Sequence, residues 1–241
     1  MSVATSWVEI PVDGSIMPSF LAVPEGGGKR GAVIVIQEIF GVNADIRKLA
    51  EVAASAGYDA LAPAVFHRTD PYFDASHDEE GFAKGRAAAA ATAPETLRHD
   101  LDAALGWLRG RADHNGKIAT WGFCFGGSAA FFSATLPGID AAVSFYGAQT
   151  VRARDGGPGF ITLAPQLRAP LFFAFGGKDP HITREDREAI RRALDENGKP
   201  YVMRVYEDED HGFFREGPDG NAGSRSVWPE VQAFLAERLA G

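Results

Sequence analysis

The amino-acid sequence predicts an α/β fold, in which a mostly parallel central sheet is flanked by helices and begins with an N-terminal antiparallel hairpin. Short apolar runs, typical of strands covered on both faces, alternate along the chain with segments of helical period. Repeated βα units of this kind form a parallel sheet with right-handed crossovers. Near the N-terminus, Asp13-Gly14 separates two alternating segments and supplies the positive φ values that a tight hairpin turn needs.

The predicted elements follow one another in a regular order. The hairpin strands span Trp7–Val12 and Ser15–Val23, and a central strand covers Ala32–Ile36. The alanine run Ala87–Ala91 favours a helix. Later strands are expected at Tyr58–Ala62, Lys117–Gly122, Ala141–Tyr146, Leu171–Phe175 and Tyr201–Tyr206, and helices at Ile46–Ala56, Pro94–Arg109, Arg184–Asn197 and Val227–Leu239.

Two irregular stretches interrupt this alternation. Residues Phe66–Gly85 are polar and rich in Asp and Glu, and residues Ala148–Arg168 are rich in Gly and Pro. Long irregular insertions in compact domains tend to be binding loops or lids. We therefore expect these two stretches to be binding loops or lids.

Composition and length exclude several classes of protein. A single α/β domain, residues 1–241, accommodates the whole chain. A net charge of −8 argues against a nucleic-acid-binding face, and we find neither a signal peptide nor an apolar run long enough to span a membrane. The single cysteine cannot form an internal disulfide. We expect a cytoplasmic monomer or small homo-oligomer that binds a small molecule.

The single cysteine lies between two glycines at a strand-to-helix junction. Gly122-Phe123-Cys124-Phe125-Gly126 joins an apolar strand to a helix rich in small residues, and it is the cysteine version of the G-x-S-x-G nucleophile elbow. The N-terminus of that helix directs its N–H groups and positive dipole end at the sulfur, which favours the thiolate. The plain alternative is that Cys124 is a buried small hydrophobic residue.

Two backbone amides are candidates for an oxyanion hole. In an elbow of this kind the hole is formed by the amide after the nucleophile and by one amide from the loop after an earlier strand. Here the first is Phe125, and Ile39, which follows the central strand, is the candidate for the second.

A histidine and an aspartate complete a candidate catalytic triad. Thiol attack requires a base and a third group that orients the base. Asp179 follows the strand predicted at Leu171–Phe175, and His211 follows the strand predicted at Tyr201–Tyr206, so both lie at the sheet edge where ligands bind. The order nucleophile, acid, histidine is the one expected for this elbow. A turn-forming aspartate and a surface histidine are the plain alternatives.

Four ordered segments resemble the dienelactone hydrolase family of the α/β-hydrolase superfamily. These segments are Gln37–Asn43, Gly122–Gly127, Gly177–Asp179 and Asp210–Phe213, and the resemblance extends over nearly the whole chain. It implies the α/β-hydrolase fold and an enzyme that opens a small lactone or ester, resembling carboxymethylenebutenolidase, through a Cys-His-Asp triad and a covalent acyl-enzyme.

The resemblance also implies roles for three further side chains. Glu38 matches the glutamate that interacts with the resting thiol and is freed by substrate binding to help form the thiolate. Arginines hold the substrate's carboxylate in this family, and Arg215 matches one of them because it stands four residues after His211. Arg86 is a looser candidate for the second. A solvated surface cation is the plain alternative for either arginine.

Other functions stay open or lack support. A broad-specificity carboxylesterase or thioesterase would use the same fold, and a non-catalytic binding protein is a further alternative. A thiol redox protein usually has a second, resolving cysteine, which is missing here. Gly26–Gly31 fits a dinucleotide-binding pattern but precedes a strand, and no spacing of Cys and His suggests a metal site. We expect no cofactor and no metal.

Overall fold

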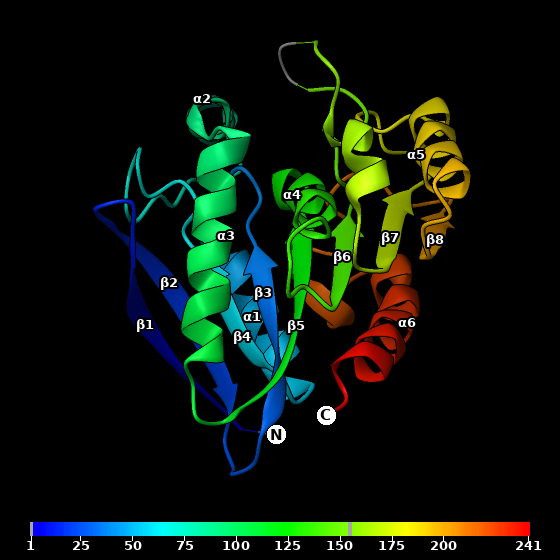
Figure 1. The fold of residues 1–241 in the computed structure, drawn as a ribbon. Coiled ribbons are helices and arrows are strands. Elements are labelled where there is room, and N and C mark those ends of the chain that lie inside the picture. Colours follow the sequence, from blue (N-terminus) through cyan, green and yellow to red (C-terminus); the bar gives the residue numbers. More distant parts are fainter. Residues whose placement is uncertain (1, 154–155) are drawn as a thin grey trace.

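The computed structural model describes residues 2–153 and 156–241, and it contains an eight-stranded sheet with helices on both faces (Figure 1). The strand order is β1-β2-β4-β3-β5-β6-β7-β8. β2 pairs antiparallel with β1 and β4, and every other pairing is parallel. The strands are β1 (Val3–Val12), β2 (Ser15–Pro24), β3 (Arg30–Ile36), β4 (Asp59–Pro63), β5 (His114–Phe123), β6 (Ala141–Phe145), β7 (Leu171–Gly176) and β8 (Tyr201–Tyr206).

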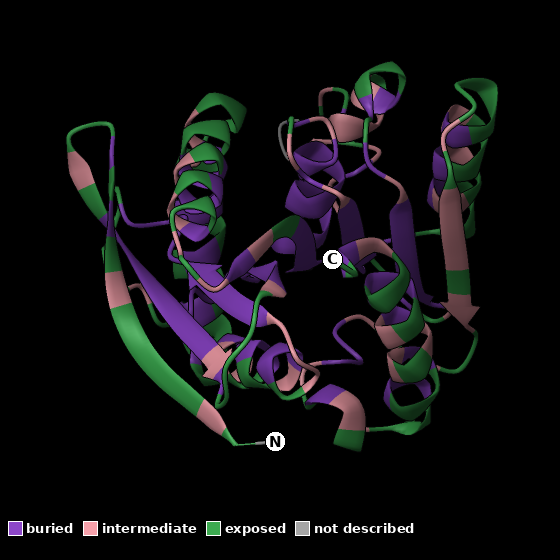
Figure 2. Ribbon diagram, turned by 60° about the horizontal axis from the view of Figure 1, so that its bottom comes forward, coloured by how far each residue is buried: buried purple, intermediate pink, exposed green. Residues whose placement is uncertain are grey.

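Helices cover both faces of this sheet. α1 (Ala44–Ser55) and α6 (Ala222–Leu239) lie on one face, whereas α3 (Pro94–Arg109), α4 (Phe125–Ser133) and α5 (Arg184–Glu196) lie on the other (Figures 1 and 2). α2 (Glu79–Ala91) lies beyond the carboxyl ends of the strands, next to the start of α3 (Figure 1). Short 3-10 turns form η1 (Phe160–Gln166) and η2 (Gly217–Asp219).

The centre of the sheet is the core of the molecule. All residues of β4, β6 and β7 are buried, as is all of β3 after its first residue, and these strands form the buried layer between the helices in Figure 2. Burial on both faces explains why these strands read as continuous apolar runs. β1 is the contrasting edge strand, with most of its residues exposed.

The predicted fold is confirmed, but the first hairpin strand begins at Val3 and not at Trp7, and two helices begin earlier than expected. The stretch Phe66–Gly85, expected to be irregular throughout, becomes helical at Glu79, because Asp78 accepts a hydrogen bond from the Gly81 amide (2.8 Å) and caps α2. The last helix begins at Ala222 and not at Val227, capped in the same way by Asn221. The predicted irregular stretch Ala148–Arg168 contains η1, and its residues 154 and 155 lie outside the described part of the chain.

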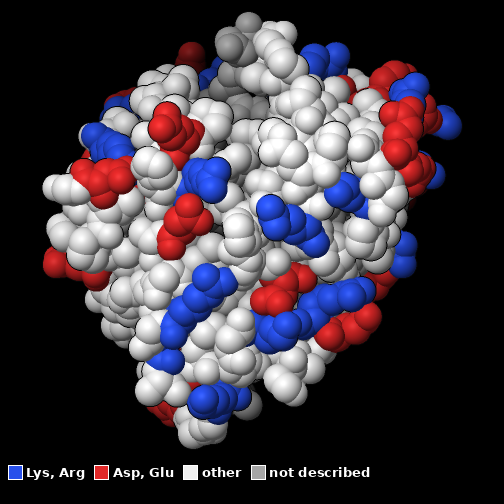
Figure 3. Space-filling view, viewed as in Figure 1, with Lys and Arg blue, Asp and Glu red and all other residues white. Residues whose placement is uncertain are grey.

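Charged side chains of both signs are interspersed on the face shown in Figure 3. This face therefore lacks the continuous basic stripe that a nucleic-acid footprint needs. Across residues 2–153 and 156–241, none of the helices combines the length and the apolar character that a membrane crossing requires.

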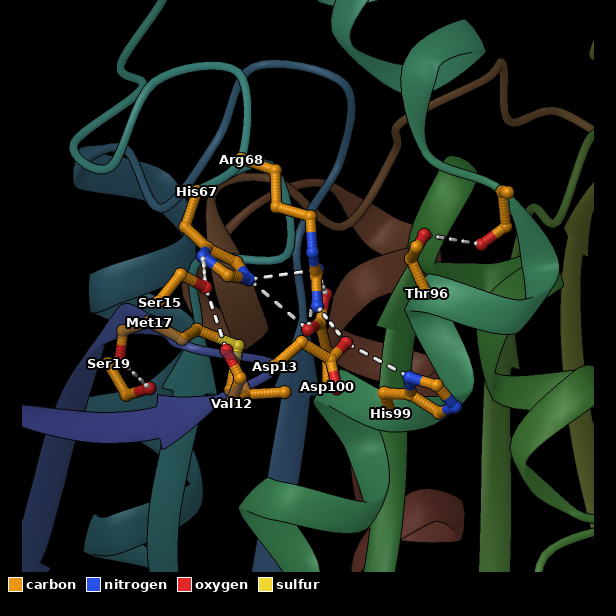
Figure 4. Close-up of polar contacts among 11 residues, drawn as sticks. Val12, Asp13, Ser15, Met17, Ser19, His67, Arg68, Thr96, His99 and Asp100 are labelled. Carbon is orange, nitrogen blue, oxygen red and sulfur yellow. Dashed lines mark hydrogen bonds and ion pairs between the residues drawn. The ribbon is translucent and has the colours of Figure 1, made fainter.

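A polar network ties the hairpin turn to α3 and to the loop after β4 (Figure 4). Asp100, fully buried on α3, accepts two hydrogen bonds from Nη1 of Arg68 (2.7 and 2.9 Å) and lies 3.2 Å from Nε2 of His67. The other terminal nitrogen of Arg68 donates to Asp13 in the hairpin turn (2.7 Å), which also contacts His99 (2.9 Å). The network therefore fixes the beginning of the stretch that leads from β4 to α2.

The same stretch packs against the loop after β3. Asp74 pairs with Gly41 in an isolated antiparallel bridge, and the amide of Ala75 donates to the carbonyl of Phe40 (3.0 Å). Asp74 also accepts from Arg47 on α1 (3.3 Å). These contacts place the start of α2 beside the loop that carries the predicted residues Glu38 and Ile39.

The network predicts a measurable contribution of Asp100 to stability. Asp100→Asn should lower the free energy of unfolding by about 2 kcal/mol, since it leaves Arg68 and His67 without their buried anionic partner. Urea denaturation at pH 7 measures this loss. Asp102→Asn is the matched control on the same helix, where an exposed pair with Arg98 should contribute less than about 0.5 kcal/mol. Equal losses in the two variants would contradict a stabilising role for the network.

Candidate active site

Cys124 lies at the sharp turn between β5 and α4. It is one of the few non-glycine residues with a positive φ in the described structure, with φ 53° and ψ −109°. Such a conformation is strained for a residue with a side chain. The Cys124 amide donates to the carbonyl of Phe145 at the end of β6 (3.0 Å), which holds the turn against the neighbouring strand.

Two glycines make this turn possible. A Cβ atom on Gly122 would lie 1.8 Å from the carbonyl oxygen of Gly126, and a Cβ on Gly126 would lie 2.1 Å from the carbonyl oxygen of Ile36 in β3. Any side chain at either position would push the strand and the helix apart. The amide of Gly126 also donates to the carbonyl of Gln37 (3.0 Å), so the loop after β3 is fixed to the elbow.

The structure brings Asp179 and His211 together. Asp179 follows β7, His211 follows β8, and Oδ2 of Asp179 lies 2.7 Å from Nδ1 of His211. The Asp179 side chain is fully buried, and its other oxygen accepts a hydrogen bond from the amide of His181 (2.8 Å). Asp179 is therefore fixed on both of its oxygens, and it holds the imidazole of His211 in one orientation.

His211 also contacts the cysteine. Burial lowers the pKa of His211, but hydrogen bonds to Asp179 and Cys124, together with the negative charges of both residues, outweigh this and raise the pKa to about 10. Because Asp179 engages Nδ1, Nε2 is the ring nitrogen available to the sulfur. The raised pKa favours the imidazolium form of His211 at neutral pH.

Glu38 and Arg215 form a second charged pair in the site. Nε of Arg215 donates to Oε2 of Glu38 (2.8 Å), whose side chain is only 4% exposed. Burial lowers the pKa of Arg215, but the charge of Glu38 outweighs this and raises it. The guanidinium also lies 5.7 Å from the ring centroid of Phe40. The expected interaction of Glu38 with the thiol stays a prediction, because the hydrogen bond that Glu38 makes here goes to Arg215.

Oε1 of Glu38 is buried without a hydrogen-bond partner among the described residues. The hydroxyl of Tyr146 is likewise buried without a hydrogen-bond partner among the described residues. Tyr146 follows β6, has a positive φ of 39°, and its ring centroid lies 5.1 Å from that of His211. Burial, and then the charge of Glu38, raise the pKa of Tyr146 well above its usual range, so the hydroxyl keeps its proton.

The candidate site opens into a cleft of about 650 Å³. Cys124 and His211 line it, and so do the two residues predicted to form an oxyanion hole, Ile39 and Phe125. Further apolar walls come from Phe40, Phe82 and Ala148. The roles of the Ile39 and Phe125 amides in an oxyanion hole stay predictions.

Three arginines line the cleft, namely Arg86, Arg152 and Arg215, together with His181 and His211. No Asp or Glu is among its described lining residues. Arg86 is exposed on α2, which lies so close to Ile39 that a Cβ on Gly85 would meet its carbonyl oxygen at 2.3 Å. Arg86 and Arg215, the two arginines expected to bind a carboxylate of the substrate, therefore line the same cleft.

Sequence reasoning missed three residues of this cleft region: Tyr146, Arg152 and His181. Tyr146 directly follows a strand, and Asp179 and His211 also lie in loops that follow strands. This position at the end of a strand could have identified Tyr146 as a candidate site residue. His181 stands two residues after Asp179 in the same turn. Arg152 had no such signal, because a glycine- and proline-rich stretch does not reveal which side chains face a cleft.

The fold and the cleft define an enzyme of the α/β-hydrolase class. The chain belongs to the dienelactone hydrolase family, which matches residues 17–239. It is therefore a hydrolase, and the resemblance noted in its sequence is confirmed.

Individual relatives agree with this assignment. A Synechocystis sp. protein described as "Putative carboxymethylenebutenolidase" is 34% identical over 99% of both chains. A Bradyrhizobium sp. protein described as "Probable 2-oxo-3-(5-oxofuran-2-ylidene)propanoate lactonase" is 29% identical over 100% of this chain and 97% of its own. The crystal structure of a "Putative Dienelactone Hydrolase" from Klebsiella pneumoniae superposes with a TM-score of 0.88 at 27% identity, covering 98% of this chain and 100% of its own.

The site geometry predicts how His211 titrates. Because hydrogen bonding to Asp179 raises the pKa of His211, Asp179→Asn should lower that pKa from about 10 by at least about one unit. NMR titration of the imidazole carbons measures the change. Asp210→Asn removes the exposed neighbouring carboxylate and should leave the pKa unchanged. A fall in Asp210→Asn without one in Asp179→Asn would make Asp210 the orienting group.

Proposed function

We propose that this hydrolase opens a small lactone or ester that carries a carboxylate, with Cys124 as nucleophile, His211 as proton carrier and Asp179 as orienting group. One observation carries the proposal. The His211–Asp179 pair contacts the elbow cysteine inside a cleft lined by arginines and by no described acidic side chain. The descriptions of the relatives as a carboxymethylenebutenolidase and as a lactonase acting on a furanylidene propanoate support the same substrate class.

In the first half of the proposed reaction, the Cys124 thiolate attacks the carbonyl carbon of the ester. The carbonyl oxygen becomes an oxyanion, and the amides of Phe125 and Ile39 donate hydrogen bonds to it. The C–O bond to the alcohol part then breaks, and the His211 imidazolium gives its proton to the departing oxygen. The products of this half are a thioester on Cys124 and a neutral imidazole.

The second half consumes one water molecule. Neutral His211 takes a proton from water while the resulting hydroxide attacks the thioester carbon, and the second oxyanion forms in the same hole. The carbon–sulfur bond breaks, the acid leaves, and the thiolate–imidazolium pair is restored. Asp179 keeps the ring oriented and stabilises its positive charge in both halves, without taking the proton.

Glu38 and Arg215 have a separate role in the proposal. A carboxylate on the substrate would compete with Glu38 for the guanidinium, because both are negatively charged acceptors for the N–H donors of Arg215. Glu38 released in this way would help to deprotonate the thiol. Arg86, on the adjacent wall, is the second candidate for binding the same carboxylate. A thiol nucleophile must stay reduced, so we also propose the cytoplasm as its location.

The proposed nucleophile is tested with a panel of lactones and aryl esters, each with and without a carboxylate. Cys124→Ala should lower hydrolysis by about 10³-fold or more, because no covalent intermediate can form. Circular dichroism and the melting temperature check that the variant is folded. Hydrolysis near the wild-type rate by the folded variant would exclude the covalent route and leave a binding or redox role for the thiol.

The proposed carboxylate site is tested by Arg215→Ala. Charge-assisted hydrogen bonds contribute roughly 1.5–3 kcal/mol, so kcat/KM for carboxylated substrates should fall by on the order of ten- to a hundred-fold. Neutral esters of similar size are the internal control and should lose much less. An equal loss on both substrate types would assign Arg215 a structural role and favour a broad-specificity carboxylesterase or thioesterase.

A further inference from the structure

Arg152 occupies a fixed position on the wall of the cleft. The backbone around it folds back on itself, since Arg152 pairs with Pro158 in an isolated bridge and the amide of Gly159 donates to the carbonyl of Val151 (3.0 Å). A further hydrogen bond runs from the amide of Ile161 to the carbonyl of Thr150 (2.7 Å). The side chain of Arg152 therefore leaves the backbone at a defined point and lines the cleft.

The guanidinium of Arg152 is also held in place. Its Nη2 donates to Oδ1 of Asp186 (2.7 Å) on the first turn of α5, and the side chain of Asp186 is only 10% exposed. The other oxygen of Asp186 accepts from the amide and hydroxyl of Thr183 (both 3.0 Å). The capping box of α5 thus fixes the Asp186 carboxylate, which in turn fixes the position of the Arg152 guanidinium.

This arrangement repeats that of Arg215. Each guanidinium lines the cleft and donates through one nitrogen to a carboxylate that does not line it, Glu38 in one case and Asp186 in the other. In both cases the carboxylate fixes the arginine while leaving further N–H donors of the guanidinium for a ligand. The side chain of Arg152 is 67% exposed, so a ligand reaches it without any rearrangement of the core.

The two arginines approach the cleft from different elements. Arg215 belongs to the loop after β8 and contacts the loop after β3, whereas Arg152 belongs to the stretch after β6 and contacts α5. His181, just before α5, lines the cleft with Arg152, and its ring centroid lies 5.0 Å from that of His211. A substrate bound in the cleft can therefore meet cationic groups that come from two separate parts of the chain.

We propose that Arg152, with His181, forms a second anion subsite, and that the preferred substrates carry two acidic groups. The preference for substrates with two acidic groups rests on the proposed function, whereas the binding of an anion at Arg152 does not. One carboxylate would bind Arg215, and the second would bind the N–H donors of Arg152 that Asp186 leaves available.

Binding of two linear acids to the Cys124→Ala protein tests the subsite without any turnover. Hexanedioate and hexanoate have the same carbon chain and differ by one carboxylate. Isothermal titration calorimetry at pH 7.5 should give a Kd for hexanedioate about tenfold or more below that for hexanoate. In the background of Cys124→Ala, Arg152→Ala should reduce this ratio to about threefold or less and leave the affinity for hexanoate unchanged, which also shows that the cleft is intact.

Arg184→Ala is the matched control for this experiment. Arg184 is an exposed arginine on the same helix as Asp186, it pairs with Glu188 (2.9 Å), and it does not line the cleft. Its removal should leave both affinities unchanged. Equal affinities for the two acids in the parent protein, or equal losses for both acids in Arg152→Ala, would overturn the subsite.

The binding result and the hydrolysis result are independent of each other. If Arg152 governs the preference for hexanedioate while Cys124→Ala leaves hydrolysis unchanged, the subsite stands and the proposed nucleophile fails. If hydrolysis depends on Cys124 but the two acids bind alike, the proposed function stands and the second subsite fails.

Discussion

The tight approach of α4 to β5 at Gly122 and to β3 at Gly126 is the constraint on which the rest of the site depends. With any side chain at either position the strand and helix would separate, and Cys124 would lose the backbone conformation that directs it into the cleft. The consequences reach further than the elbow, because the Gly126 amide also binds the Gln37 carbonyl. That hydrogen bond fixes the loop that carries Glu38 to the first turn of the helix after Cys124.

Charged groups are paired at the buried centre, whereas the cleft walls carry further cations. Asp179 pairs with His211, and Glu38 pairs with Arg215. Arg86 and Arg152 add positive side chains to the walls, and no Asp or Glu is among the described residues that line the cleft. Water on the walls lowers the cost of keeping these side chains ionised, so they can attract an anionic substrate.

The fold and the candidate triad were predictable from the sequence, whereas the partners of the charged groups were not. Strands with continuous apolar runs specify a parallel sheet, and Cys124, Asp179 and His211 lie at the same edge of it because they follow the parallel strands β5, β7 and β8. The contact of Arg215 with Glu38 spans 177 residues and depends on how two loops pack. No local pattern encodes such a contact, and the same holds for Arg152, which lies in a stretch without periodicity.

Chemistry and substrate choice therefore depend on different parts of this chain. The candidate triad sits on turns fixed by the sheet and by buried hydrogen bonds, and small displacements there would prevent reaction. The wall arginines come from α2, from the stretch after β6 and from the loop after β8. In these segments the sheet constrains the position of the backbone less. A change of cation on these walls alters which acid is bound without disturbing the elbow, so one fold can retain its reaction while its substrate range changes. Under the proposed function, the walls of the cleft select the substrate, and the elbow cysteine carries out the reaction.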